Sequence, residues 1–201
     1  MGNSMVVLEI IEASKGRYRL HLDSGDDIVL YKGEVRKWNL KEGSELSEDM
    51  YDSIVEEILR PRCRKRALHL LEKQERTAHQ LLQKLREGGY SEALAKDAIA
   101  YCEGYGYIND QSYAERYVRT YQSTKSDLQI RNALYQKGIK GELVEQALQE
   151  REYEESDMIE RLLKKRGYNP QQADRKEQQK TYQYLMRRGF SSSDIRQAMH
   201  L

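Results

Sequence analysis

A pattern that recurs about every fifty residues most constrains what this chain can fold into. Three segments align with one another: LREGGYSEALAKDAI, LYQKGIKGELVEQAL and LMRRGFSSSDIRQAM. In each, a Leu stands four residues before a Gly and a large apolar residue follows that Gly. Repeats of this length are typical of small helical units that stack in tandem. The equivalent positions are Leu85, Leu134 and Leu185, and the joint glycines are Gly89, Gly138 and Gly189.

The spacing around each glycine predicts where helices end and begin. We expect the Leu to be the last core residue of one helix and the Gly to take the left-handed position that ends it. Thr77 and Ser126 open TAHQ and SDLQ, which are capping boxes twelve residues before the first two glycines. Asp174 stands fifteen before the third glycine, which predicts a middle helix one turn longer. Gly167 is expected to end the first helix of the third unit.

The first forty residues have a different period. RYRLHL alternates strictly, and the apolar segments MVVLEII and DIVLY flank it, with SKG and SGD between them as turns. This predicts an antiparallel meander from Met5 to about Lys32. A helix is expected behind Ser47, interrupted by Pro61. The predicted fold class is mainly α, with a small N-terminal antiparallel β meander and a tandem array of three three-helix, helix-turn-helix-like repeats. The predicted segments are a meander (1–46), a linking helix (47–61) and three repeats (62–109, 110–152 and 153–201).

The stretch CEGYGYINDQSYAERYV combines two nearby glycines with four tyrosines. It suggests a phosphate-binding loop, an aromatic platform for nucleic acid, or a joint between helices. No predicted strand precedes the glycines and no Lys-Ser/Thr pair follows them, which disfavours a phosphate loop. Tyr113, Tyr117 and Tyr121 recur at helical spacing, as in a core-packing stripe. We therefore interpret this stretch as a joint between repeats.

The residues that usually carry chemistry do not form a catalytic pattern. The four histidines are scattered without a zinc-ligand spacing, and Cys63 and Cys102 stand alone without a CxxC motif. We expect no enzyme activity, no metal and no cofactor. The cysteines are interpreted as free thiols in a reducing cytoplasm. No apolar run approaches the length of a membrane span, and the N-terminus lacks a signal-peptide pattern, so neither membrane insertion nor export is expected.

The charge is nearly balanced overall but sorted into local clusters. Lys and Arg total 34 against 33 Asp and Glu. RPRCRKR holds five basic residues in seven, and residues 161–188 hold nine basic against two acidic, a net of +7. Two interpretations stay open, a solvated helix face or a surface for phosphates or an acidic groove. The candidate binding residues are Arg60, Arg62, Arg64, Lys65, Arg66, Arg76, Arg116, Arg119, Lys125, Lys164, Lys165, Arg166, Arg175, Lys176, Arg187 and Arg188.

Several of these motifs together resemble a known family. ERTAHQLLQKL, GYINDQSYAERYV, TKSDLQIRNALYQKGI and YLMRRGF, in this order over about residues 60–201, resemble RecX, the bacterial regulator of the RecA recombinase. The resemblance implies a curved array that lies in the groove of the RecA–DNA filament. It also implies inhibition of ATP hydrolysis, strand exchange and co-protease activity, and so a role in DNA repair and the SOS response. The meander is outside this shared pattern. We expect a monomer.

A second class of function is a helix-turn-helix DNA-binding protein that acts without RecA. A recognition helix needs polar side chains that reach bases at its N-terminal end. The helices predicted after the joints begin SEALAKD, KGELVEQ and SSSDIRQ, which are acidic rather than rich in Arg, Asn or Gln. This argues against base readout. Contacts to DNA, single- or double-stranded, are expected to be with phosphates and independent of sequence.

Overall fold

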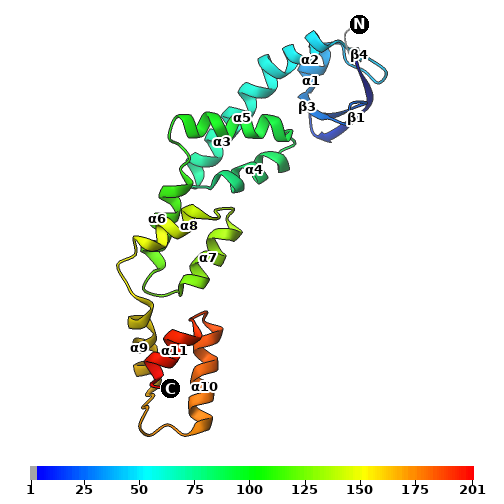
Figure 1. Cartoon of the computed structure of the whole chain (residues 1–201). Coiled ribbons are helices and arrows are strands. Elements are labelled where there is room, and N and C mark those ends of the chain that lie inside the picture. The colour runs from blue at the N-terminus through cyan, green and yellow to red at the C-terminus, as the bar shows by residue number, and fades with distance from the viewer. Residues whose placement is uncertain (1–3) are drawn as a thin grey trace. The chain divides into compact units, whose positions relative to one another are not determined.

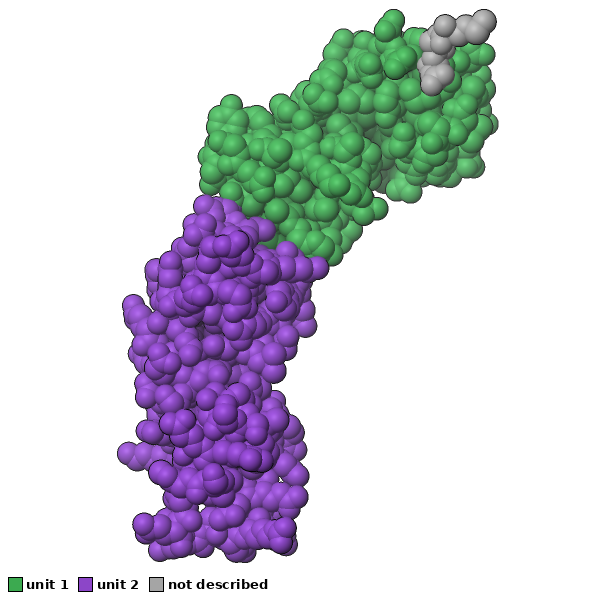
Figure 2. Space-filling view, in the orientation of Figure 1, with its two compact units in different colours: residues 1–108 green, residues 109–201 purple. Residues whose placement is uncertain are grey.

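The computed structural model describes residues 4–201, so the first three residues of the predicted 1–46 segment lie outside the described part. The chain forms two compact units, residues 1–108 and 109–201 (Figure 2). Unit 1 contains the sheet and the first three-helix module, and unit 2 contains the second and third modules (Figure 1). Each unit is described separately below.

The N-terminal segment forms an antiparallel sheet with the strand order β3-β2-β1-β4. Alternation places Leu20 and Leu22 of β2 on the buried face. The predicted three-stranded meander is confirmed, but the sheet has a fourth strand. This strand is only two residues long and pairs with the start of β1, so no alternation could announce it. The strands are β1 (Met5–Ser14), β2 (Arg17–Leu22), β3 (Asp27–Tyr31) and β4 (Glu45–Leu46), and helix α1 (Lys32–Lys37) follows β3.

The helix behind Ser47 does not end at Pro61, so that prediction is wrong. Ser47 caps α2 (Glu48–Ile54) by accepting a hydrogen bond from the Met50 amide. The chain continues without a break through the π-helical segment η1 (Val55–Leu59) into α3 (Arg60–Lys73). Proline lacks an amide donor, and in an α-helix its ring clashes with the carbonyl four residues earlier. The wider π-helical turn just before Pro61 changes that spacing, which explains how the helix continues through the proline.

Each of the three modules consists of three helices (Figure 1). The predicted capping boxes at Thr77 and Ser126 are both present. Asp174 caps α10, which has 13 residues against 10 in α4 and in α7, so the extra turn is also present. The modules are α3, α4 (Ala78–Glu87) and α5 (Glu92–Gly104); α6 (Asp110–Tyr121), α7 (Asp127–Gln136) and α8 (Glu142–Gln149); and α9 (Glu155–Arg166), α10 (Arg175–Arg187) and α11 (Ser192–Met199).

The three joints share one geometry. The joint leucines are fully buried, and the joint glycines have φ values of 88°, 86° and 87°. In each joint the amide after the glycine donates to the carbonyl of the joint leucine, at 3.3, 3.0 and 3.4 Å. This is the Schellman arrangement, in which a left-handed residue stops the helix and satisfies its last carbonyls. Gly167 ends α9 in the same left-handed conformation, as the sequence predicts.

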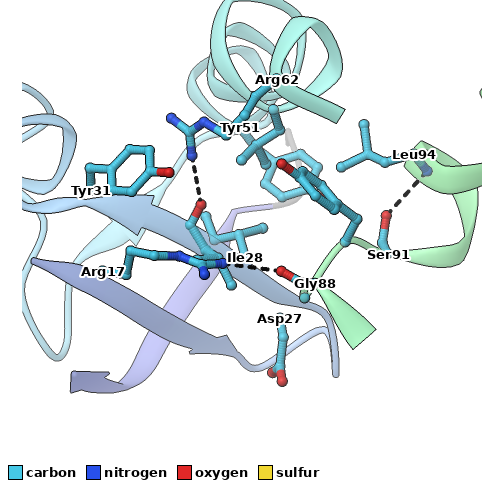
Figure 3. Close-up of a pocket in the computed structure, with 13 residues that line it drawn as sticks. Arg17, Asp27, Ile28, Tyr31, Tyr51, Arg62, Gly88, Ser91 and Leu94 are labelled. Atoms are coloured by element: carbon cyan, nitrogen blue, oxygen red, sulfur yellow. Dashed lines mark hydrogen bonds between the residues drawn. The ribbon is translucent and has the colours of Figure 1, made fainter. Parts of the chain in front are cut away.

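Within each unit, one joint also contacts the part of the fold that precedes its module, which is the sheet in unit 1 and the second module in unit 2. In unit 2, the Ser126 hydroxyl of the second module donates to the Arg188 carbonyl of the third at 2.6 Å. In unit 1, the Arg17 guanidinium of β2 donates to the Gly88 carbonyl at 3.1 Å (Figure 3). The sheet therefore contacts the first module at the joint position where, in unit 2, the second module contacts the third.

Packing agrees with this equivalence. A Cβ on Gly189 would lie 2.8 Å from the Ser126 hydroxyl, and a Cβ on Gly89 would lie 3.0 Å from a methyl of Val29 in β3. The distance at Gly189 is closer than real Cβ contacts permit without movement, and the distance at Gly89 is tighter than most real Cβ contacts. The sheet and the first module form one continuous apolar core, whereas the second and third modules each have their own. The N-terminal sheet thus serves as the first element of the array, as a terminal capping unit does.

Candidate functional site

The basic cluster at the start of α3 is largely engaged inside unit 1. Arg60 pairs with Glu56 at 2.8 Å, and Arg62 pairs with Glu34. Arg64 makes two hydrogen bonds to Asp97, at 2.9 and 3.0 Å. These three guanidinium groups have donors committed to carboxylates of the same unit. Their first role is to hold α3 to its neighbours.

Further contacts support this structural role. Arg62 also donates to the Val29 carbonyl at 3.1 Å and lies 4.4 Å from the Tyr31 ring centroid (Figure 3). The hydrogen bond to Asp97 raises the pKa of Arg64. Lys65 and Arg66 are exposed, and neither has an ion pair within residues 4–201. Of the five basic residues of this cluster, these two remain free for an external partner.

The other candidate cations before residue 160 are divided between the residues just before α4 and the α6 region. Arg76 is partly buried, and Arg116 and Arg119 are exposed on α6. The Lys125 ammonium donates to the Tyr117 hydroxyl at 2.8 Å and lies 3.8 Å from the centroid of the Tyr121 ring. The predicted tyrosine stripe of α6 therefore does pack on the second core, and its outer side is covered by a lysine.

The third module carries the densest group of unneutralised cations. Lys164, Lys165 and Arg166 form the last turn of α9, where the helix dipole stabilises positive charge. Four more basic residues lie along α10 and a fifth at its C-cap. No carboxylate of residues 4–201 forms an ion pair with any of these eight side chains. We call the set the third-module cationic surface, and its members are Lys164, Lys165, Arg166, Arg175, Lys176, Lys180, Arg187 and Arg188.

Two of these arginines converge on one aromatic ring. The Arg166 guanidinium lies 4.4 Å from the Tyr184 ring centroid, and the Arg188 guanidinium lies 4.8 Å from it. A cation–π contact holds a guanidinium through its face and leaves its N–H donors unused. The two arginines are thus positioned but not neutralised. The sequence did not reveal Tyr184, because the approach of α9 to α10 creates the arrangement.

An acidic cluster links the second and third modules. The Asp127 amide donates to the Glu155 carboxylate at 2.6 Å, and Arg151 pairs with the Asp127 carboxylate. Burial raises the pKa of Asp127 and the pKa of Glu155, and the negative charge of Asp127 raises the pKa of Glu155 further. Arg151 and Glu155 therefore join the third module to the second through Asp127.

Among residues 4–201, no cluster of His, Cys, Asp and Glu suits a metal ion. Cys63 and Cys102 are free and buried, and burial raises the pKa of Cys63 to about 12, so its thiol is protonated at neutral pH. No helix within the described range is long and apolar enough to cross a membrane. The cationic surface is the feature that geometry singles out.

The fold defines the class of protein: an array of three-helix modules preceded by a small sheet, with a dense group of basic side chains on the last module. Sequence profiles of RecX match the chain three times, as the first three-helix domain over residues 63–102, the second over 109–148 and the third over 152–199. The regulatory protein RecX of Limosilactobacillus reuteri (strain DSM 20016) is 32% identical over 196 residues, covering 94% of this chain and 74% of the relative. The chain belongs to the RecX family of regulatory proteins.

Other relatives and solved structures of RecX also match most of the chain. The regulatory protein RecX of Clostridium perfringens (strain SM101 / Type A) is 26% identical over 92% of this chain and 89% of the relative. A crystal structure of regulatory protein RecX is 29% identical, covers 98% of both chains and superimposes with a TM-score of 0.64. RecX from Lactobacillus salivarius, also 29% identical, covers 70% of this chain and 94% of its own, with a TM-score of 0.59.

Proposed function

We propose that this chain binds the RecA nucleoprotein filament and inhibits its ATPase, recombinase and co-protease activities, and so modulates DNA repair and the SOS response. Family membership supports the choice of RecA as partner. The tandem modules support it because arrays of this kind present extended binding surfaces. The proposal includes a monomer that acts in the cytoplasm without a catalytic step of its own.

The observation that carries the nucleic-acid part of the proposal is the third-module cationic surface. Eight basic side chains without carboxylate partners repel one another, and a polyanion relieves that repulsion. Arg166 and Arg188 keep their N–H donors available beside Tyr184, in the manner that phosphate oxygens require. We propose that this surface contacts DNA phosphates within the filament, without reading sequence. Lys65 and Arg66 are the remaining contributors that we propose on the first module.

Acidic residues near the starts of the helices after the joints weigh against the alternative of an independent helix-turn-helix protein. Glu92 lies in the first turn of α5, Glu142 and Glu145 in that of α8, and Asp194 in that of α11. A recognition helix presents its N-terminal residues to base edges, and carboxylates there repel phosphates. Binding to phosphates therefore fits this surface better than base readout does.

The test is the DNA-dependent ATPase of RecA at protein concentrations well below those of RecA. We expect the wild-type chain to inhibit and the variant K164E/K165E to inhibit less, most clearly at low salt. The matched control E160K/E177K adds positive charge near the same surface and should not weaken inhibition. If the ATPase rate is unchanged while the chain binds DNA in the absence of RecA, the proposal is refuted and the alternative of an independent DNA-binding protein is favoured.

A further inference from the structure

The turn after α5 carries two tyrosines that no core uses. Tyr105 is 66% exposed and Tyr107 is 57% exposed, although Cys102 and Ile108 on either side are buried. The predicted interpretation of this stretch as a joint accounts for the buried residues and for the tyrosine stripe of α6. The interpretation as a joint does not account for two large aromatic rings that lie next to each other in solvent. Adjacent exposed apolar groups of this kind are a feature of interaction surfaces.

Backbone hydrogen bonds hold both tyrosines in place. The Gly106 amide donates to the Glu103 carbonyl at 2.9 Å, and the Tyr107 amide donates to the Cys102 carbonyl at 2.8 Å. Gly106 takes the left-handed conformation, with φ of 73°, that this closed turn requires. A ligand that binds here meets rings whose backbone is already ordered, so little conformational entropy is lost on binding.

The rings form a continuous series with a cation at its inner end. The ring centroids of Tyr105 and Tyr107 are 6.2 Å apart and their planes differ by 24°, an offset stack. The ring centroids of Tyr101 and Tyr105 are 4.8 Å apart. The Arg64 guanidinium lies 4.8 Å from the Tyr101 ring centroid, and its hydrogen bonds to Asp97 fix it there. The series begins at a fixed guanidinium and ends at an exposed π face.

The surroundings of the turn are open rather than concave. A Cβ placed on Gly104 or on Gly106 would have no heavy atom within 4 Å beyond its chain neighbours. Anchors of a protein partner bind best in desolvated pockets, whereas flat exposed π faces suit bases, which stack on tyrosine whatever their sequence. We propose that Tyr105 and Tyr107, continued inward by Tyr101 and Arg64, form a stacking surface for unpaired bases of single-stranded nucleic acid.

This inference deepens the nucleic-acid part of the proposed function, and its test needs no RecA. Fluorescence anisotropy compares a labelled oligothymidylate with an abasic strand of the same length, which has the phosphates but not the bases. We expect the wild-type chain to bind the oligothymidylate at least about fivefold more tightly than the abasic strand. The variant Y105A/Y107A should lose this preference, and Y105F/Y107F, which keeps the rings, should retain it.

Two control variants separate stacking from other effects. Y135A removes another exposed tyrosine, in α7, and should leave the preference unchanged. K164E/K165E should weaken binding to the oligothymidylate and to the abasic strand by the same factor, because both strands carry phosphates. Equal affinity of the wild-type chain for the two strands, or an unchanged preference in Y105A/Y107A, would overturn the inference without touching RecA inhibition. Loss of RecA binding in Y105A/Y107A with an intact base preference would also overturn it, by marking a protein-contact surface.

Discussion

Substitution of Gly189 by alanine tests whether the joint glycines serve packing between modules as well as helix termination. Gly189 has φ of 87°, and an added Cβ would lie 2.8 Å from the Ser126 hydroxyl and 3.1 Å from the Leu128 Cβ. The hydroxyl cannot move away freely, because it donates to the Arg188 carbonyl and accepts from the Gln129 amide. The new methyl group must therefore displace the second module or distort the joint.

Gly167 provides a matched control within the same unit. It ends α9 with φ of 68°, but an added Cβ there would meet no atom within 4 Å. G167A should cost only the left-handed strain of an alanine, about 1–2 kcal/mol. G189A should cost that strain plus an overpacking penalty of about 1–3 kcal/mol. We therefore expect a loss of about 2–5 kcal/mol for G189A.

Urea unfolding of the full chain, followed by far-ultraviolet circular dichroism, measures both losses. Hydrogen exchange adds a local readout. G189A should reduce the protection of amides in α7 and α10, whereas G167A should leave α7 unchanged. Equal free-energy losses for the two variants, with unchanged protection in α7, would show that the joint glycine acts through backbone conformation alone.

Three further predictions test other parts of the structure. Truncation to alanine of any joint leucine (Leu85, Leu134 or Leu185), each fully buried, should cost about 2–5 kcal/mol, and losses below about 1 kcal/mol at all three would show that the repeat alignment is wrong. Because burial raises the folded-state pKa of Glu155, the folded state binds more protons than the unfolded state, and wild-type stability falls as pH rises through that folded-state pKa. E155Q removes this titrating group, so it should increase the free energy of unfolding more at pH 7 than at pH 5. E160Q, at an exposed position, is the control, and an equal increase from E155Q at both pH values would contradict the burial argument. Cys63, with its pKa raised to about 12, should resist iodoacetamide at pH 8 until the chain unfolds, and rapid native-state labelling would refute its assigned burial.

Local signals in the sequence were sufficient to predict the joints. The Leu-to-Gly spacing, the capping boxes at Thr77 and Ser126, and the longer helix behind Asp174 all depend on residues within about fifteen positions of one another. The three-strand meander followed from strict alternation in β2. These features depend little on contacts that are distant in the sequence, which is why they could be predicted without a structure.

Features that depend on distant contacts could not be predicted. The helix continues through Pro61 because a π-helical segment precedes it, and no residue pattern announces that segment. The basic cluster of α3 suggested a binding surface, yet Arg62 and Arg64 pair with carboxylates that lie 28 and 33 positions away in the sequence. The arrangement around Tyr184 likewise arises only when α9 packs near α10.

Co-sedimentation with RecA filaments assembled on single-stranded DNA with a non-hydrolysable ATP analogue tests the central claim most directly. We predict that the wild-type chain pellets with the filaments, and that R166E/R188E, with the charge reversed on both sides of Tyr184, binds at least about tenfold more weakly at low salt. A wild-type chain that stays in the supernatant, or a variant that pellets as well as the wild type, would contradict the account.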